Sequence, residues 1–312
     1  MTMRALAVDV AAGACRIVEA PAPRPGPGQV LVEMKVSAVN EMDVQVRAGG
    51  WARQVRQFRK TGPVLTGFEF AGVARSDGAR IRAGQRVIGY SPVLDGPRTH
   101  AQFAAIDERD LAPIPDELLD EDAAALVVMG LTAIEVLEAI APLKAGQKAL
   151  VIGAAGGVGA YGVQLAASRG AQVTAVCSAA NADFARRQGA AEVRTYEAAA
   201  YQQGDAFNLV LDTPARSSFG EAARYMARGG TYVSTNPTAD LGGFLRAMLS
   251  PKRAGWLMLL RADPARLKRL IAAWCAGTLR PVIDSVYDLS DADAAFDRFA
   301  TRGKQGRVLL RI

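Results

Sequence analysis

The chain of 312 residues is half hydrophobic, which is enough for one large domain or two ordinary domains with their own cores, and it carries a formal net charge of +6. Its three cysteines, Cys15, Cys177 and Cys275, are too few and too far apart for a disulfide framework, which predicts a reducing, cytoplasmic setting. With one histidine (His100), no CxxC pair, no dense basic stripe and no apolar run of eighteen residues, the sequence argues against a zinc site, a nucleic-acid partner and an integral membrane segment.

The first part of the chain predicts a β-rich unit. Short β-branched and apolar runs are separated by glycine and proline turns such as that over 21–28, which is the pattern of a small barrel or sandwich. The predicted strands cover 4–10, 29–39, 68–76, 85–92 and 100–107. From Pro115 onward the period becomes helical, and acidic residues near the start of the stretch over 116–140 favour a helix N-terminus there.

Strands and helices alternate in the next part of the chain, as they do in an open parallel sheet. Strands are predicted over 148–153, 171–176, 191–196, 207–213 and 230–235, and helices over 158–169, 182–189 and 263–277. The stretch over 280–312 is predicted as strand, helix and strand, and it is similar in texture to the first part of the chain. We therefore expect a discontinuous first domain, with an α/β domain inserted into it.

A glycine-rich turn joins the first of these strands to its helix. Gly153, Gly156 and Gly159 stand where the chain must turn sharply, where a pyrophosphate must approach the backbone, and where helix and strand must pack closely. The helix N-terminus adds free N–H groups and a positive dipole end. The turn lacks the lysine of a triphosphate-binding loop, so the pattern predicts a dinucleotide. The loop residues predicted to hold it are Gly153, Ala155, Gly156, Gly157, Val158 and Gly159.

The end of the next predicted strand favours NADPH over NADH. Enzymes that use NADH usually carry an acidic residue there for the ribose hydroxyls, whereas this chain has Cys177 and Ser178, followed by Asn181. No carboxylate at this point would repel a 2′-phosphate, and Ser178 and Asn181 can donate hydrogen bonds to it. Arg186 or Arg187 would add a positive field.

Several stretches together resemble the quinone oxidoreductase branch of the medium-chain dehydrogenase/reductase superfamily. The residues AAGGVGAYGVQLAASRGAQV resemble its cofactor loop, and AVNEMDVQVRAG over 38–49 is similar to its A-x-N-x-x-D-x-x-x-R-x-G element. The stretches TGFEFAGVA, AGQRVIGY, GLTA and GKQGRVLLRI resemble further family elements, with Gln85 where aspartate is usual. The resemblance implies a GroES-like β-rich catalytic domain over 1–117 and 276–312 and a Rossmann domain, a doubly wound parallel sheet, over 118–275. It also implies a homodimer formed through the Rossmann sheets.

The resemblance further implies chemistry without a metal. Zinc enzymes of the superfamily carry G-H-E where this chain has Gly67-Phe68-Glu69, and they carry a cysteine near the position of Asn40. They also have a four-cysteine loop after the strand near Tyr90, where this chain has no cysteine. What remains is hydride transfer from NADPH to a quinone or to the activated C=C of an α,β-unsaturated carbonyl. The protein then has to position the reactants, exclude water and polarise the acceptor carbonyl.

Two candidate catalytic residues come from the resemblance. Asn40 would stand beside the nicotinamide and donate a hydrogen bond to the acceptor carbonyl, or else cap the following turn. Tyr90 is the candidate proton donor, whereas His100 is expected to be a structural residue on a strand. Asp43 and Arg47, four residues apart, predict an ion pair within one short helix.

Further cofactor contacts are implied in the same way. Thr132 would face the nicotinamide amide, or else bond to its own helix backbone. Tyr196 would lie near the adenosine phosphate or serve as a core aromatic, and Lys304 would approach the cofactor or remain a surface charge. The other cofactor residues expected are Thr213, Thr235, Asn236 and Gly306.

Two segments are specific to this chain. The stretch over 50–62 would edge the active site as a lid, with Trp51 and Phe58 stacking on a flat substrate, or else form an amphipathic surface helix. The apolar stretch over 241–260 would form a subunit interface, a substrate wall or a contact with a membrane surface. Two other functions stay open: a pathway-specific enoyl reductase of a biosynthetic intermediate, and a non-catalytic NADPH-binding protein.

Overall fold

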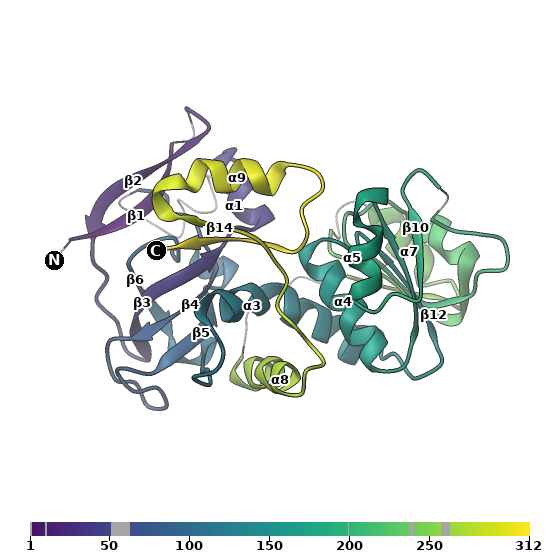
Figure 1. Ribbon diagram of the computed structural model, residues 1–312, viewed down its shortest axis with the longest axis horizontal. Coiled ribbons are helices and arrows are strands. Elements are labelled where there is room, and N and C mark those ends of the chain that lie inside the picture. The colour runs from purple at the N-terminus through teal and green to yellow at the C-terminus, as the bar shows by residue number, and fades with distance from the viewer. Residues whose placement is uncertain (1, 10, 51–62, 199, 237–239, 257–262) are drawn as a thin grey trace.

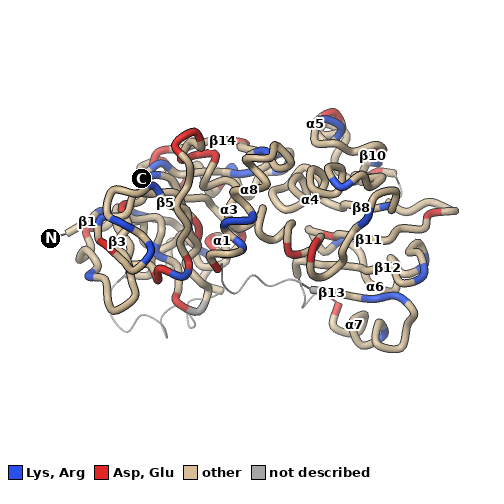
Figure 2. Tube along the Cα trace, turned by 90° about the horizontal axis from the view of Figure 1, so that it is seen from below, with Lys and Arg blue, Asp and Glu red and all other residues tan. Residues whose placement is uncertain are grey.

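The structure is a computed structural model that describes residues 2–9, 11–50, 63–198, 200–236, 240–256 and 263–312. The chain forms two lobes side by side, with both termini in the first lobe and the strands between residues 148 and 256 in the second (Figure 1). Basic and acidic residues are interspersed over both lobes (Figure 2).

A mixed sheet in the first lobe joins the two ends of the chain. Its strand order is β14-β15-β3-β4-β5-β7, with β6 also paired to β3. The last strand runs antiparallel to β3, with Leu309 opposite Ala38, so the C-terminal segment completes a sheet that the N-terminal segment begins. This confirms the predicted return of the chain to its first part. The elements are β3 (Gln29–Ala38), β4 (Glu69–Ala74), β5 (Arg86–Tyr90), β6 (Phe103–Asp107), β7 (Leu111–Pro113), β14 (Ile283–Asp288), β15 (Arg307–Arg311), the separate hairpin β1 (Thr2–Asp9) and β2 (Ala14–Pro21), and helices α1 (Glu41–Arg47) and α9 (Ala292–Ala300).

The second lobe is a parallel sheet of order β10-β9-β8-β11-β12-β13. The order reverses between β8 and β11, which is the switch point at which doubly wound sheets bind ligands. Both central strands are buried apolar runs, as expected for strands covered on two faces. The elements are β8 (Lys148–Ile152), α4 (Gly157–Ser168), β9 (Gln172–Cys177), α5 (Ala182–Arg187), β10 (Glu192–Thr195), β11 (Phe207–Asp212), α6 (Phe219–Ala222), β12 (Met226–Ser234), α7 (Leu241–Ala247) and β13 (Arg253–Trp256).

Helix α3 (Asp120–Glu135) packs between the lobes, against α4, α8 (Pro264–Cys275) and β4. With the single π-helical turn that follows it, the helical stretch Asp120–Ile140 is long and apolar enough to cross a membrane by length and composition. In the protein, however, 72% of its most apolar window is buried. Its composition is therefore that of a core helix, built around side chains such as Leu126 and Leu131.

Two contacts tie the C-terminal segment to the second lobe. The Tyr161 hydroxyl on α4 donates to the Ala125 carbonyl at 3.1 Å and accepts from the Val282 N–H at 3.2 Å. The Gly306 N–H donates to the Ala155 carbonyl in the glycine loop at 2.9 Å. The chain end therefore reaches the cofactor loop expected from the sequence. The predicted domain boundary at 275–276 stays a prediction, and α8 packs mainly on α3 and β7.

Candidate active site

The glycine loop between β8 and α4 is held by close backbone packing. Gly153 has a φ of +83°, and a Cβ there would lie 2.3 Å from the Thr213 hydroxyl. A Cβ on Gly159 would lie 2.1 Å from the Gly153 carbonyl oxygen. These two glycines are therefore required by the protein's own packing, one for the turn and one for the approach of helix to strand.

Gly156 differs from its neighbours because it faces open space. Its φ of −77° suits any residue, and a Cβ there would meet only the Gly153 carbonyl oxygen, at 3.4 Å. It is the N-cap of α4, so the first free N–H groups of this twelve-residue helix point toward the same region. An uncrowded backbone at a helix N-terminus fits the pyrophosphate of a dinucleotide. Among the other predicted loop residues, Ala155 is buried and Gly157 and Val158 are half-buried.

Polar residues end the strands on one side of this loop. Ser178 directly follows β9, and Asn181 is buried three residues later, with its side-chain oxygen accepting from Gln305 at 2.9 Å. Tyr196 directly follows β10 and is half-buried, and its backbone N–H donates to the Cys177 carbonyl at the end of β9 at 3.1 Å. These three predicted residues therefore lie at the edge of the sheet that carries the glycine loop.

On the other side of the loop, two threonines follow the strands after the switch point. The Thr213 hydroxyl donates to the Ile152 carbonyl at 3.0 Å, and the Thr235 hydroxyl donates to the Thr213 carbonyl at 2.8 Å. The Asn236 N–H donates to the Ser234 hydroxyl at 3.2 Å. Three predicted residues thus lie at the carboxyl edge of the sheet with the glycine loop: Thr213, Thr235 and Asn236. The hydrogen bonds described for them are to other residues of the protein.

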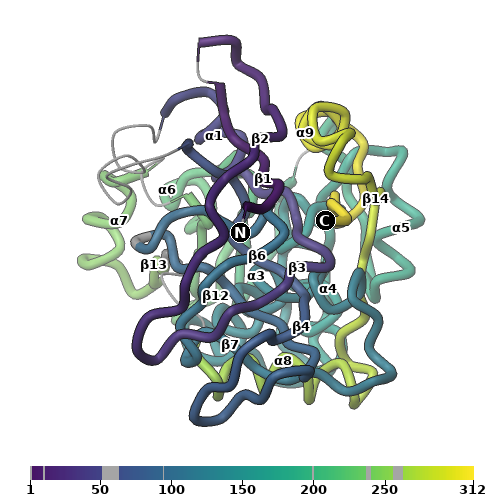
Figure 3. Tube along the Cα trace, turned by 90° about the vertical axis from the view of Figure 1, so that its left-hand side faces the viewer, coloured from purple at the N-terminus to yellow at the C-terminus, as the bar shows by residue number. Residues whose placement is uncertain are grey.

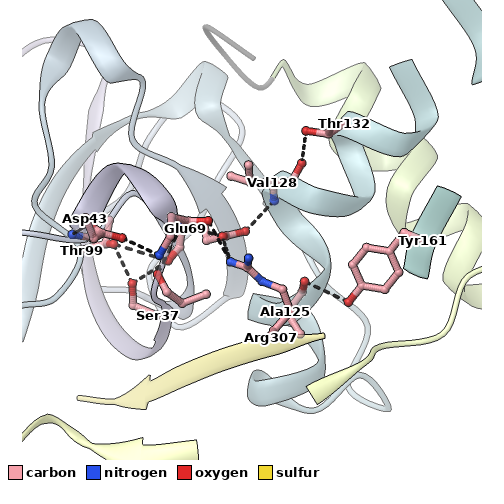
Figure 4. A network of polar contacts seen from close by, with 12 residues as sticks. Ser37, Asp43, Glu69, Thr99, Ala125, Val128, Thr132, Tyr161 and Arg307 are labelled. Carbon is pink, nitrogen blue, oxygen red and sulfur yellow. Dashed lines mark hydrogen bonds and ion pairs between the residues drawn. The ribbon is translucent and has the colours of Figure 1, made fainter. Parts of the chain in front are cut away.

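A buried polar cluster in the first lobe lies against α3 (Figure 4). Glu69 is fully buried and forms an ion pair with Arg307, which is 2% exposed. The Asn40 amide donates to Glu69 at 2.8 Å and, weakly, to the Ala38 carbonyl at 3.4 Å, while its oxygen accepts from Arg307 at 3.0 Å. The second Glu69 oxygen accepts from the Val128 N–H of α3 at 2.6 Å. Burial raises the pKa of the Glu69 carboxyl, and the Arg307 guanidinium opposes that rise.

Arg307 connects this cluster to the cofactor loop. A Cβ on Gly157 would lie 3.2 Å from the Arg307 Cδ atom, so the side chain passes the first turn of α4 on its way to Glu69. Its Nε atom is buried and has no hydrogen-bond partner among the described residues. A buried donor without a partner beside a helix N-terminus adds to the fit of this region to a phosphate-bearing cofactor.

The predicted ion pair between Asp43 and Arg47 is wrong. The Asp43 carboxylate accepts from the Asn40 N–H at 2.9 Å and from the Gly67 N–H at 2.6 Å, and it is fully buried. Burial raises the pKa of this carboxyl to about 7, while the two N–H groups oppose the shift. Arg47 instead donates to the Gly13 carbonyl and lies near acidic residues of α9. Asp43 thus fixes the turn that carries Asn40, a role that the i, i+4 spacing does not reveal.

Tyr90, Thr132 and His100 are all buried. The Thr132 hydroxyl donates to the Val128 carbonyl of its own helix at 2.7 Å, which is the alternative considered for it, and its cofactor contact stays a prediction. His100 bonds to the Thr66 hydroxyl at 2.7 Å, and burial lowers its pKa to about 4, as suits a neutral structural histidine. Tyr90 lies opposite Glu69 on the neighbouring strand, and burial raises its pKa, so its role as a proton donor stays a prediction.

The C-terminal loop holds two further predicted residues. Gly306 has a φ of +86°, and a Cβ there would lie 2.3 Å from the Val282 carbonyl oxygen, so glycine is required where this loop meets the cofactor loop. Lys304 is half-buried with its ammonium 4.6 Å from the Phe299 ring centre, and burial lowers its pKa. Trp51 and Phe58 lie outside the described residues.

Glu69, Arg307 and Asp43 belong to the buried polar cluster but are not among the site residues predicted from the sequence. The sequence marks two of them, because Glu69 and Arg307 are each a charged residue at the start of a largely apolar strand, over Glu69–Ala74 and Arg307–Arg311. Such charges are buried only when paired. In the described part of the chain no cluster of histidine, cysteine, aspartate or glutamate could hold a metal ion, and the absence of zinc stays a prediction.

Comparisons with known proteins agree with this architecture. The Alcohol dehydrogenase GroES-like domain family matches residues 26–116, and the Zinc-binding dehydrogenase family matches residues 188–310. A chloroplast envelope quinone oxidoreductase homolog of Arabidopsis thaliana is 29% identical over 94% of this chain and 92% of its own length. A trans-enoyl reductase of Aspergillus terreus is 27% identical over 92% of this chain and 87% of its own. The structure of the quinone oxidoreductase from Coxiella burnetii covers all of both chains with a TM-score of 0.90 at 23% identity. The chain therefore belongs to the medium-chain dehydrogenase/reductase superfamily, in its quinone oxidoreductase branch.

Proposed function

We propose that this protein is an NADPH-dependent, zinc-independent reductase that transfers hydride to a quinone or to the activated C=C of an enone or enal. The observation that carries the proposal is the position of the buried Asn40–Glu69–Arg307 cluster directly against the open glycine loop. Family membership supports a pyridine-nucleotide-dependent oxidoreductase. Gly67-Phe68-Glu69, with phenylalanine at the position of a zinc-binding histidine, supports chemistry without metal.

In this proposal the bound NADPH supplies the hydride. The glycine loop and the α4 N-terminus bind the pyrophosphate, and Arg307 holds the chain's C-terminal segment against that loop. Glu69 and Asp43 fix Asn40, one through its side chain and the other through its backbone. Asn40 has two amide hydrogens. The one in the long 3.4 Å hydrogen bond to the Ala38 carbonyl is the one available to an acceptor carbonyl.

The cofactor preference is tested by titrating the protein with NADPH and with NADH and following the fluorescence of each. We expect NADPH to bind at least about tenfold more tightly, since Ser178 and Asn181 leave no acid to repel a 2′-phosphate. Tighter binding of NADH would contradict the proposal.

The substrate class is tested by NADPH consumption with panels of quinones, enones and enoyl thioesters. Turnover of quinones or simple enones supports the proposal. Turnover confined to an enoyl thioester would favour the pathway-specific enoyl reductase, a function that the Aspergillus relative carries in its name. Cofactor binding without turnover of any acceptor would favour a non-catalytic role.

Replacing Asn40 with alanine should slow hydride transfer while leaving NADPH binding nearly unchanged. One hydrogen bond to developing charge contributes about 2–4 kcal/mol, which corresponds to about a thirtyfold to thousandfold loss in rate. Single-turnover oxidation of NADPH by a reactive enone measures the step directly, and thermal unfolding checks that the variant is folded. An unchanged rate would leave Asn40 as a residue of the turn and make Tyr90 the next candidate.

We further propose a cytoplasmic homodimer formed through the second lobe. β13 is an edge strand of the described parallel sheet, and α7 packs beside it at the periphery of the molecule (Figure 3). Exposed leucines lie on α7 and just after it. Leu245 is 68% exposed and Leu249 is 94% exposed, which is unusual for a free surface. Changing both to glutamate should convert a dimer into a monomer in light scattering. Leu119→Glu is the matched control, because Leu119 is a 62% exposed leucine at the start of α3 and lies outside α7 and β13. A monomeric parent protein would contradict this proposal.

A further inference from the structure

Arg216 lies in the loop after β11 and stacks on Tyr196, which follows β10. The guanidinium carbon is 4.2 Å from the centre of the tyrosine ring. In the sheet order β10-β9-β8-β11, the two residues come from strands separated by β9 and β8. The contact therefore crosses the carboxyl edge of the sheet beside the glycine loop, which joins β8 to α4.

The loop holds the backbone of Arg216 in a defined position. Buried Asp212 accepts from the Arg216 N–H at 3.1 Å and from the Ser217 N–H at 2.7 Å. Ala215, just before Arg216, has a φ of +52°, the one positive φ at a non-glycine residue in the described chain. A left-handed alanine costs conformational energy, and such strain concentrates at functional positions. The strained turn and the Asp212 carboxylate together direct the exposed arginine back across the edge of the sheet.

The charge of Arg216 is not used within the described protein. No carboxylate pairs with it there, whereas Arg186 pairs with Asp183 at 2.7 Å and Arg194 pairs with Asp205 at 2.6 Å. Its ring contact with Tyr196 orders the side chain without neutralising it. An ordered, unneutralised guanidinium fork is suited to bind an anion with two oxygens.

Its place in the sheet identifies the anion. The adenosine half of a dinucleotide lies over the first βαβ unit of such a sheet, and its ribose reaches the end of the second strand, here β9. That strand end offers only the neutral donors Ser178 and Asn181, which cannot balance the charge of a phosphate. We propose that Arg216 is the cationic residue that binds the 2′-phosphate of NADPH and so sets the preference for NADPH over NADH. This inference rests on the proposed use of NADPH.

The test compares adenosine 2′,5′-bisphosphate with 5′-AMP, which lacks the 2′-phosphate, by calorimetric titration of the parent protein and of Arg216→Gln. Glutamine keeps most of the side-chain length and a hydrogen-bond donor but removes the charge. We expect the bisphosphate to bind about tenfold to a hundredfold more weakly to the variant and 5′-AMP to bind within about twofold of the parent. Arg224→Gln, an exposed arginine shortly after α6, is the matched control and should change neither affinity. Arg187→Gln, an exposed arginine on α5, tests the other cation considered for this phosphate.

Two results would overturn the inference. An equal loss of both ligands would mean that Arg216 shapes the loop or contacts the shared adenosine. A loss of bisphosphate binding in Arg187→Gln, with Arg216→Gln unaffected, would move the cation to α5. The parent protein separates this inference from the proposed function: if it binds NADH more tightly than NADPH, the cofactor proposal fails before any variant is considered.

Discussion

Gly156→Val should abolish NADPH binding and leave the fold nearly intact. The φ of −77° at Gly156 suits valine, and a Cβ there meets no atom of the described protein closer than 3.4 Å. The added side chain would instead occupy the space through which a pyrophosphate reaches the α4 N-terminus. We expect the dissociation constant for NADPH to rise more than about a hundredfold, which is about 3 kcal/mol.

Gly159→Val is the matched variant for this prediction, because it places the same side chain one helical turn further along. A Cβ there would lie 2.1 Å from a backbone oxygen, so we expect a loss of at least about 3 kcal/mol in the free energy of unfolding. Cofactor fluorescence titration and thermal unfolding should thus separate the two variants. If Gly156→Val binds NADPH like the parent, the pyrophosphate does not lie on this loop.

The glycine loop could be predicted because the residues that determine its structure are close together in the sequence. Strand, glycines and helix follow one another between residues 148 and 168, and glycine is required at 153 and 159 because of contacts between neighbouring segments. The alternation of β8 to β12 was predictable for the same reason, since these strands are short runs between turn residues, whereas β13 was not predicted as a strand. Even here one boundary moved: the strand predicted over 230–235 begins at Met226.

The polar cluster could not be predicted in the same way. Glu69 and Arg307 are 238 residues apart, and only the return of β15 to the first sheet brings them together. Asp43 shows the opposite error, because its spacing from Arg47 suggested a local pair. In the fold, Asp43 accepts a hydrogen bond from the Gly67 N–H, and Arg47 pairs with acidic residues of α9. Tertiary contacts therefore determine the partners of the buried charged residues, whereas local sequence determines the structure of the cofactor loop.

The buried pair of Arg307 and Glu69 predicts the largest effect on stability. Arg307→Met removes the cation and leaves a fully buried carboxylate with only hydrogen-bond donors around it. Removing one member of a buried ion pair costs about 3–5 kcal/mol, since the remaining charge is no longer compensated. Glu69→Gln should be destabilising for the converse reason, because it leaves a buried guanidinium without a counter-charge.

The double variant Arg307→Met/Glu69→Gln distinguishes charge from packing. If uncompensated charge causes the loss, the double variant should be more stable than the sum of the two single losses predicts, as measured by urea unfolding followed by circular dichroism. Additive losses would assign the effect to packing alone.

The pH dependence of Arg307→Met provides a second, independent measurement. Burial raises the pKa of Glu69, and without Arg307 nothing cationic opposes that rise. A carboxyl whose pKa is higher in the folded than in the unfolded protein contributes its stability at low pH and loses it as the pH rises through the folded pKa. The instability of Arg307→Met should therefore shrink as the pH falls from about 8 to about 5, because Glu69 can then take up a proton in the folded state. A deficit that is the same across this range would show that Glu69 is not left as a buried charge. The contribution of Arg307 would then come from the contacts of its side chain with the first turn of α4.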